Sequence, residues 1–200
     1  KGKPAIVKEI KSSESTQPPP HPFDLTSLQL EAYNKIGITP SQTLKIAQSL
    51  YTSAYISYPR TSSQQLPTAL NYKKIITKLS KQKSYEKICQ ELLAKNTLFP
   101  NNGKKTDPAH PSIHPTGEIP KKLAGSKAQL YDLITRRTLA SFGDQAKRES
   151  INVTIDVNDE PFIAKGSRII EPGWYSIYGK FSRSKEEHLP KLKPDEKLKV

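Results

Sequence analysis

The sequence has one cysteine, no methionine and no long apolar run. The single cysteine, Cys89, excludes an internal disulfide and fits a reducing compartment such as the cytoplasm. No apolar stretch approaches the roughly 18 residues of a membrane span, and the first residues do not resemble a signal peptide. We therefore expect a cytoplasmic protein with no membrane partner. Because the chain starts at Lys1 and lacks methionine, we also expect an internal piece of a longer protein.

Negative charge is also scarce. The 200 residues contain 32 Lys and Arg but only 19 Asp and Glu, which leaves a net charge of +13. Such an excess favours a polyanionic partner, either nucleic acid or an anionic membrane surface. No basic helix carries a face rich in Trp and Phe, so nucleic acid is the stronger expectation. A basic surface that serves only solubility stays open at this point.

Helical periodicity begins near residue 24. Apolar residues recur at helical spacing over 24–36, and a second helix follows directly, for which Thr39 and Gln42 form a capping-box pattern. A short alternating strand is expected over 55–58. Two helices joined by a short turn and followed by a strand predict a winged helix-turn-helix, with Tyr58 where the wing begins.

The rest of the chain contains further helical segments, a long aperiodic segment and two strand-like segments. Further helices are expected from Pro67 to Leu79, from a cap at Ser84 to Asn96, and over 126–142. Between them, residues 97–120 show no periodicity, and a loop of that length is functional or disordered. Strands are expected over 1–10 and on both sides of an Asn158-Asp159 turn, with a polar, proline-rich linker over 11–22.

These elements predict an α+β chain. A mainly helical domain, residues 21–147, is expected to be inserted between two segments of a β-rich hinge domain. The first hinge segment, with its linker, covers 1–20, and the return strands cover 148–200.

The stretch ISYPRTSSQQLP, residues 56–67, displays a tyrosine among polar residues. A tyrosine that attacks a phosphodiester needs an accessible phenol, loss of a proton whose ordinary pKa is about 10, and a cation to hold the developing charge. Tyr58 and Arg60 are two residues apart on an extended segment, so their side chains share one face. The alternative is a half-buried wing tyrosine beside an unrelated phosphate-binding arginine.

A second group of candidate residues lies in the long loop, in DPAHPSIHPTG, residues 107–117. His110 and His114 are four apart, but the proline after each excludes the regular helix of a helical zinc pair. With few acids and no cysteine close by, we expect no metal site here. Histidines in a proline-stiffened loop suit phosphate contacts or proton transfer.

Together these motifs resemble a known family. PFDLTSLQLEAYNKIGITPSQTLKIAQSLYTSAYISYPRTSSQQLP, followed by HPSIHPTG, is similar to the tyrosine-bearing region of type IA DNA topoisomerases. The similarity is strongest to the archaeal-type enzymes and to the topoisomerase half of reverse gyrase, and it covers residues 18–178. It implies a protein that breaks and rejoins one DNA strand through a 5′-phosphotyrosine intermediate, associated with the nucleoid and preferring single-stranded DNA.

The resemblance assigns roles to individual residues. It implies that Tyr58 is the nucleophile, that Arg60 lies beside the scissile phosphate, and that His110 contacts this phosphate and assists proton transfer. Ser62 stands where the family more often has aspartate, and Arg136 matches a recurrent arginine with either a structural or a DNA-contacting role. The residues expected to contact DNA are Thr61, Ser62, Ser112, His114, Thr116 and Arg136.

The resemblance also shows what this sequence lacks. The family's acidic metal cluster and catalytic lysine belong to a toprim domain, and no Asp-x-Asp-x-Glu-like run occurs here. We therefore expect Mg²⁺ to act in the full enzyme through that missing domain, with none bound by this chain. The chain by itself is expected not to cleave DNA, and the rest of the topoisomerase is its expected partner.

Two other functions stay open on sequence grounds. One is a non-catalytic winged-helix module that binds single-stranded DNA, in which Tyr58 only packs or stacks. The other is a tyrosine recombinase, which forms a 3′ linkage. A recombinase needs a set of arginines and a histidine around its tyrosine, and the HPSIHPTG loop does not match that set.

Overall fold

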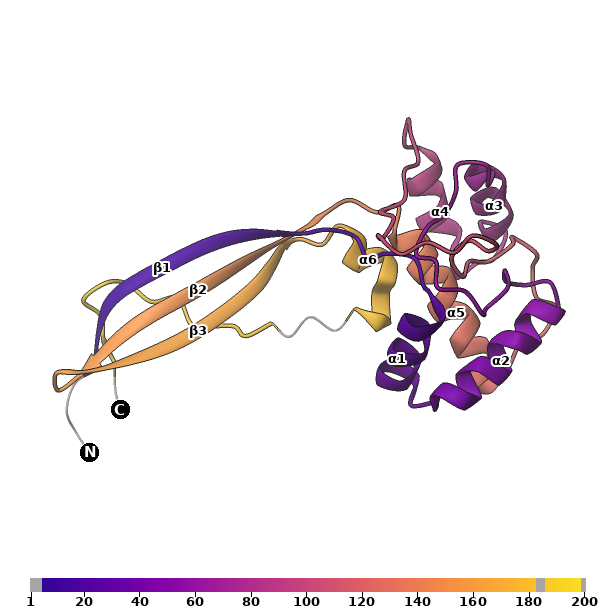
Figure 1. Cartoon of the computed structure of the whole chain (residues 1–200). Helices are drawn as coiled ribbons and strands as arrows, with labels where there is room; N and C mark the ends of the chain where they lie inside the picture. The colour runs from indigo at the N-terminus through magenta and orange to yellow at the C-terminus, as the bar shows by residue number, and fades with distance from the viewer. Residues whose placement is uncertain (1–4, 183–185, 199–200) are drawn as a thin grey trace. The chain divides into compact units, whose positions relative to one another are not determined.

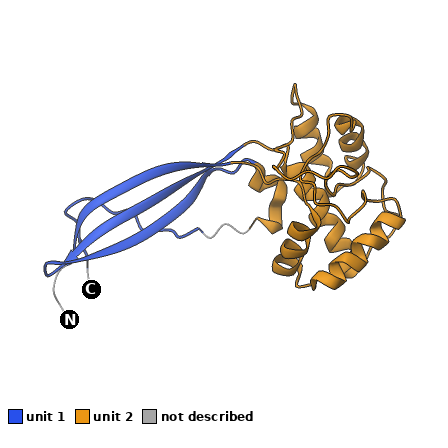
Figure 2. Ribbon diagram, viewed as in Figure 1, with its two compact units in different colours: residues 1–17, 145–173, 183–200 blue, residues 18–144, 174–182 orange. Residues whose placement is uncertain are grey.

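The computed structural model of the chain describes residues 5–182 and 186–198. These residues form an α+β structure with six α-helices and a four-stranded antiparallel sheet, the fold class that the sequence predicts (Figure 1). They divide into two compact units (Figure 2). The sheet unit contains the described residues of 5–17, 145–173 and 186–198, and the helical unit contains 18–144 and 174–182.

The sheet unit is built on a long antiparallel ladder. Its strands are β1 (Ala5–Gln17), β2 (Ala146–Val157), β3 (Glu160–Glu171) and β4 (Lys197–Leu198), in the order β3-β2-β1-β4. The turn between β2 and β3 places Asn158 at φ 58° and Asp159 at φ 67°. Two left-handed residues in succession match the twist of a two-residue hairpin, which confirms the predicted turn.

β1 is longer than the sequence indicates. The expected linker over 11–22 is wrong in its first half, because Lys11 to Gln17 pair with β2 down to Ala146. This part of β1 is polar and exposed on both faces, so it carries no alternation of apolar residues. The backbone ladder, reinforced by a hydrogen bond from Ser12 Oγ to Glu149 Oε1 (2.7 Å), forms the strand there.

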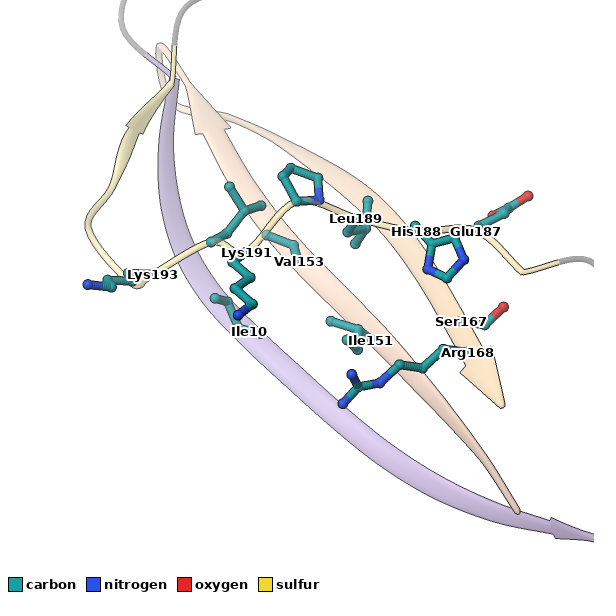
Figure 3. A pocket seen from close by; sticks show the side chains of 12 residues that line it. Ile10, Ile151, Val153, Ser167, Arg168, Glu187, His188, Leu189, Lys191 and Lys193 are labelled. Carbon is teal, nitrogen blue, oxygen red and sulfur yellow. The ribbon is translucent and has the colours of Figure 1, made fainter. Parts of the chain in front are cut away.

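A cavity of about 560 Å³ lies on one face of the sheet (Figure 3). Its floor includes Ile10, Ile151 and Val153, and the segment 187–193 passes over it. A Cβ atom on Gly166 would lie 2.8 Å from Leu189 Cγ, so glycine at this position permits the close approach of the covering segment.

The helical unit packs around α5. Leu130, Leu133, Ile134 and Leu139 of this helix are fully buried. The helices are α1 (Leu25–Ile36), α2 (Pro40–Thr52), α3 (Tyr72–Leu79), α4 (Glu86–Leu93), α5 (Gly125–Ala140) and α6 (Trp174–Tyr178), which a 3₁₀ turn, Gly179–Phe181, follows. No helix among the described residues has the length and apolar character needed to cross a membrane.

The first two helices begin and end where local sequence signals place them. Asp24 caps α1 and forms a reciprocal pair with Ser27, and Gly37 ends the helix in the left-handed region at φ 80°. Thr39 and Gln42 form the predicted capping box at the start of α2.

Three expectations about secondary structure are wrong. The strand expected over 55–58 is reduced to a single bridge between Ile56 and Pro115, so no regular wing hairpin forms. α3 begins at Tyr72, after a turn and a cap from Asn71, and α4 follows Tyr85 without a side-chain cap from Ser84.

The return segment is also not all strand. Residues Trp174–Phe181 are helical, and Ile177, Tyr178 and Phe181 are buried in the helical core. Their aromatic and apolar side chains suit a strand equally well in isolation, so only the long-range contacts with α5 decide the helix.

Candidate active site

Tyr58 follows a tight reversal of the chain after α2. The reversal places Ala54 at φ 59°, and Tyr55 N donates to Leu50 O at 3.0 Å. The half-buried Tyr58 ring then lies between two other rings. Its centroid is 5.3 Å from that of Tyr51, in an edge arrangement, and 4.6 Å from that of His110.

The long loop is ordered along the tyrosine segment. Ser57 N donates to His114 O at 2.8 Å, and His114 N donates to Ser57 Oγ at 3.0 Å. Farther along, Ser112 N donates to Gln65 O at 2.9 Å. These bonds join segments more than forty-five positions apart and bring His110 against Tyr58.

Asp107 holds the two segments together at the histidine. Its Oδ1 accepts from the backbone amides of Ala109 and His110, both at 3.0 Å. Its Oδ2 accepts from the amide and the hydroxyl of Ser62, both at 3.3 Å. The hydrogen bonds from these backbone amides lower the pKa of the carboxyl below its usual value, so Asp107 is ionised at neutral pH.

Arg60 is exposed and available. Within residues 5–182 and 186–198, no ion pair and no hydrogen bond engages its guanidinium. The preceding Pro59 is buried and fixes the backbone between Tyr58 and Arg60. A cationic fork two residues from a phenol is an arrangement that can hold a phosphate beside a nucleophile.

Three residues expected to contact DNA have buried side chains. Thr61 and His114 are each 5% exposed and Ser112 is fully buried. The His114 Nδ1–H donates to Ser112 O at 2.7 Å, and the ring lines a small apolar space between α3 and α5. Burial lowers the pKa of His114 below its usual value. None of these side chains is at the surface, where a DNA contact requires it.

The remaining expected residues divide between the site and the core. Ser62 is exposed beside Asp107, and Thr116 Oγ1 donates to Ala54 O at 2.7 Å, which closes the reversal below Tyr58. Arg136 lies elsewhere, on α5, where its Nε donates to Asp132 at 2.9 Å and its NH1 group to Ile177 O at 3.1 Å.

Sequence reasoning missed two residues of the site. Tyr51 falls at helical spacing with the buried residues of α2, which predicts a core position, but it is 41% exposed and touches Tyr58. Asp107 received no role, although it begins the histidine stretch and stands before a proline, a usual start of a side-chain-capped turn. Within the described ranges, no group of three or more His, Cys, Asp or Glu residues is arranged to hold a metal.

Comparisons with known proteins show which family the sequence resembles. A family model described as DNA topoisomerase matches residues 1–200. DNA topoisomerase 1 of Pyrococcus horikoshii is 47% identical over 194 residues, which are 96% of this chain and 28% of that protein. The corresponding enzyme of Methanocaldococcus jannaschii is 46% identical over 199 residues, 99% of this chain and 26% of its own length.

The fold matches a solved relative as well. The structure of full-length topoisomerase I from Thermotoga maritima aligns with a TM-score of 0.71 at 26% identity, over 98% of this chain and 33% of that one. The chain thus spans about a quarter of the length of the curated relatives named above. The resemblance indicated by the tyrosine and histidine motifs is confirmed, and the chain belongs to the type IA DNA topoisomerase family.

Proposed function

We propose that this chain supplies the nucleophile of a reaction that breaks and rejoins one DNA strand through a 5′-phosphotyrosine intermediate. The observation that carries the proposal is the contact between the Tyr58 and His110 rings, 4.6 Å apart, with the free Arg60 two residues along the chain. We assign the activity to the full-length protein that contains this chain.

The proposed reaction exchanges one phosphodiester for another. The Tyr58 phenolic oxygen forms a bond to phosphorus, and the bond from phosphorus to the 3′ oxygen of the preceding nucleotide breaks. The phenolic proton is transferred away and the leaving 3′ oxygen gains one, so the proton balance is zero. Because the energy of the broken bond is kept in the phosphotyrosine, the reverse attack by the 3′ hydroxyl reseals the strand without a nucleotide cofactor.

Two side chains support the attack. Arg60 holds the non-bridging phosphate oxygens, because a planar cationic fork donates to two oxygens at once. His110 contacts the same phosphate and transfers a proton between the phenol and solvent or the leaving oxygen. Asp107 and Ser62 hold the histidine loop in register with Tyr58.

A magnesium ion is implied by the family, but the described residues do not form a site for it. We place the magnesium ion in a toprim domain of the full-length protein. Stabilisation of the leaving oxygen is thus shared between this chain and the toprim domain. Loss of one well-placed donor costs about a hundredfold or more in rate, so the 200 residues by themselves bind DNA without cutting it.

We further propose that the sheet unit serves as the hinge of strand passage. The support is the order of elements: β1 precedes the helical segment 18–144, and β2 and β3 follow it. A helical unit that is connected through paired strands can move while the ladder stays intact. Single-stranded DNA is the proposed substrate, because the chain belongs to a family whose resemblance implies that preference.

Replacement of Tyr58 tests the proposed function. In the full-length protein with magnesium present, Tyr58→Phe is expected to abolish the covalent adduct with end-labelled single-stranded DNA and to leave binding nearly unchanged, since only the phenolic oxygen is removed. Tyr33→Phe, the same change at an exposed tyrosine of α1, is the matched control and is expected to leave adduct formation intact. Adduct formation by the Tyr58→Phe protein would refute the assignment and favour a non-catalytic binding role for this segment.

A further inference from the structure

Tyr51 is a large ring at the surface beside the nucleophile. It lies in the last turn of α2, where Ala47 and Leu50 are fully buried while Tyr51 is 41% exposed. The core therefore uses the neighbouring positions of the helix and leaves this ring partly in water. Exposed aromatic rings of this size are depleted at ordinary surfaces and enriched at binding sites.

The ring is held in a defined place. Ala54 N donates to Tyr51 O at 2.8 Å and closes the reversal that leads to Tyr58. The two rings then meet edge to face, with centroids 5.3 Å apart and planes at 73°. Among the described residues, Tyr58 is the one aromatic partner of Tyr51, and no hydrogen bond engages the Tyr51 hydroxyl.

The surroundings of the ring suit a nucleotide. Residues 52–54 are exposed, and Arg60 presents an unpaired guanidinium on the same tyrosine segment. Proteins that hold single strands combine cations for the backbone with aromatic faces for the bases. In a DNA strand, only the sugar separates a phosphate from the neighbouring base. A phosphate bound at Tyr58 therefore brings a base close to the Tyr51 ring, whose centroid is 5.3 Å from that of Tyr58.

We propose that Tyr51 stacks on a nucleobase adjacent to the phosphate that Tyr58 attacks, and so positions the strand for cleavage. This inference rests on the proposed function and extends it to a specific base contact. Stacking requires a π-face and no particular hydrogen-bonding edge, so the contact tolerates any of the four bases.

The test combines ring variants with substrates that lack single bases. In the full-length protein, adduct formation is measured for the unmodified chain, Tyr51→Phe, Tyr51→Leu and Tyr33→Leu, the last a control at another exposed tyrosine, on α1. The substrates are one single-stranded oligonucleotide and its versions with an abasic site at each position within two nucleotides of the cleavage site.

We expect Tyr51→Leu to lower kcat/KM about tenfold to a hundredfold, mainly by raising KM, since a base stacked on an aromatic ring contributes about 1–3 kcal/mol. Tyr51→Phe and Tyr33→Leu should stay near the unmodified protein. For one position of the abasic site, the unmodified protein should show the same loss of kcat/KM that Tyr51→Leu causes on the intact oligonucleotide. On that abasic substrate, Tyr51→Leu should cause no further loss.

Three results would overturn the proposal. The first is a Tyr51→Leu defect of the same size on every abasic substrate, which would mean that Tyr51 only orients Tyr58. The second is a Tyr51→Leu protein as active as the unmodified one. The third is a Tyr51→Phe defect equal to that of Tyr51→Leu. If the unmodified protein forms no adduct at all, the proposed function itself fails, and this outcome is distinguishable from the other three.

Discussion

Two arginines of the helical unit, Arg60 and Arg136, differ in their exposure and in the bonds that their side chains make. Arg60 is exposed and has no ion pair or hydrogen bond to any described residue. The Arg136 side chain is 18% exposed and is engaged by Asp132 and by the carbonyl of Ile177. The same Asp132 also accepts from the Tyr85 hydroxyl at 3.0 Å and pairs with Lys180 at 2.8 Å.

The difference separates a binding arginine from a structural one. A phosphate that approached Arg136 would have to displace bonds that join α5 to α6, and their loss would leave the Asp132 carboxylate partly buried with fewer donors. Arg60 has no such bonds to lose, so its full donor capacity is open to a ligand. We therefore favour a structural role for Arg136 and a phosphate-binding role for Arg60.

Apart from loss of the nucleophile itself, the largest effect is expected at Arg60. In the full-length protein, Arg60→Gln is expected to lower the rate of adduct formation about a hundredfold or more, because a donor aimed at the reacting phosphate is lost. Arg60→Lys should recover only part of this rate, because a point charge replaces a bidentate fork. Single-turnover assays measure the rates of both variants, and the thermal midpoint should not change.

The control is Lys104→Gln, which removes one exposed charge from the long loop over residues 97–120. If Arg60→Gln and Lys104→Gln lowered the rate of adduct formation equally, Arg60 would contribute only its positive charge and no specific contact with the phosphate.

A smaller effect is expected at Asp107. Asp107→Ala removes the acceptor for the amides of Ala109 and His110 and for Ser62, so the histidine loses its fixed position. We expect adduct formation to fall about tenfold to a hundredfold, as displacement of a catalytic group does. Asp107→Asn keeps one acceptor oxygen and should retain more activity than Ala. Identical rates for Asp107→Ala and the unmodified protein would show that the loop needs no such anchor.

Arg136 is expected to affect stability and not cleavage. Arg136→Ala should lower the free energy of unfolding by about 1–3 kcal/mol, because the bonds to Asp132 and Ile177 are lost in a half-buried setting. Thermal melts measure this, and adduct formation well below the melting temperature should match that of the unmodified protein. A cleavage defect without a stability loss would reverse the comparison between the two arginines.

The smallest effect is a pH dependence from His114. Burial holds the pKa of His114 in the folded protein below the ordinary 6.5, so below about pH 6.5 the unfolded chain binds a proton that the folded chain does not. Its contribution to stability is therefore complete above pH 6.5 and declines as the pH falls toward the folded pKa. In the His114→Gln protein, the thermal midpoint should therefore fall less between pH 6.5 and pH 5 than it does in the unmodified protein. If the thermal midpoint of His114→Gln fell with pH as it does in the unmodified protein, His114 would not be the cause of the loss of stability in acid.

Features fixed by neighbouring residues could be predicted from the sequence. The capping box at Thr39 depends on contacts within four residues, and the Asn158-Asp159 turn depends on its own two residues. Features that depend on distant pairing could not. The polar half of β1 becomes a strand only through β2, and the expected wing gives way to one bridge between Ile56 and Pro115.

The candidate site shows the same division. Tyr58, Arg60 and His110 could be named from their motifs and the family resemblance, because each lies in a short recognisable stretch. The burial of His114 could not, since a proline-rich loop with two histidines gives no sign of which ring points into the core. Asp107 and Tyr51 gain their roles only from contacts with Ser62 and Tyr58, which the folded chain brings together.

The chemical identity of the DNA adduct shows directly whether Tyr58 is the nucleophile. The full-length protein is incubated with magnesium and single-stranded DNA, the trapped complex is digested, and the modified peptide and nucleotide are identified by mass spectrometry. We expect one modified residue, Tyr58, joined to a 5′ phosphate. Attachment to another residue, or a 3′ phosphate linkage at Tyr58, would contradict this assignment.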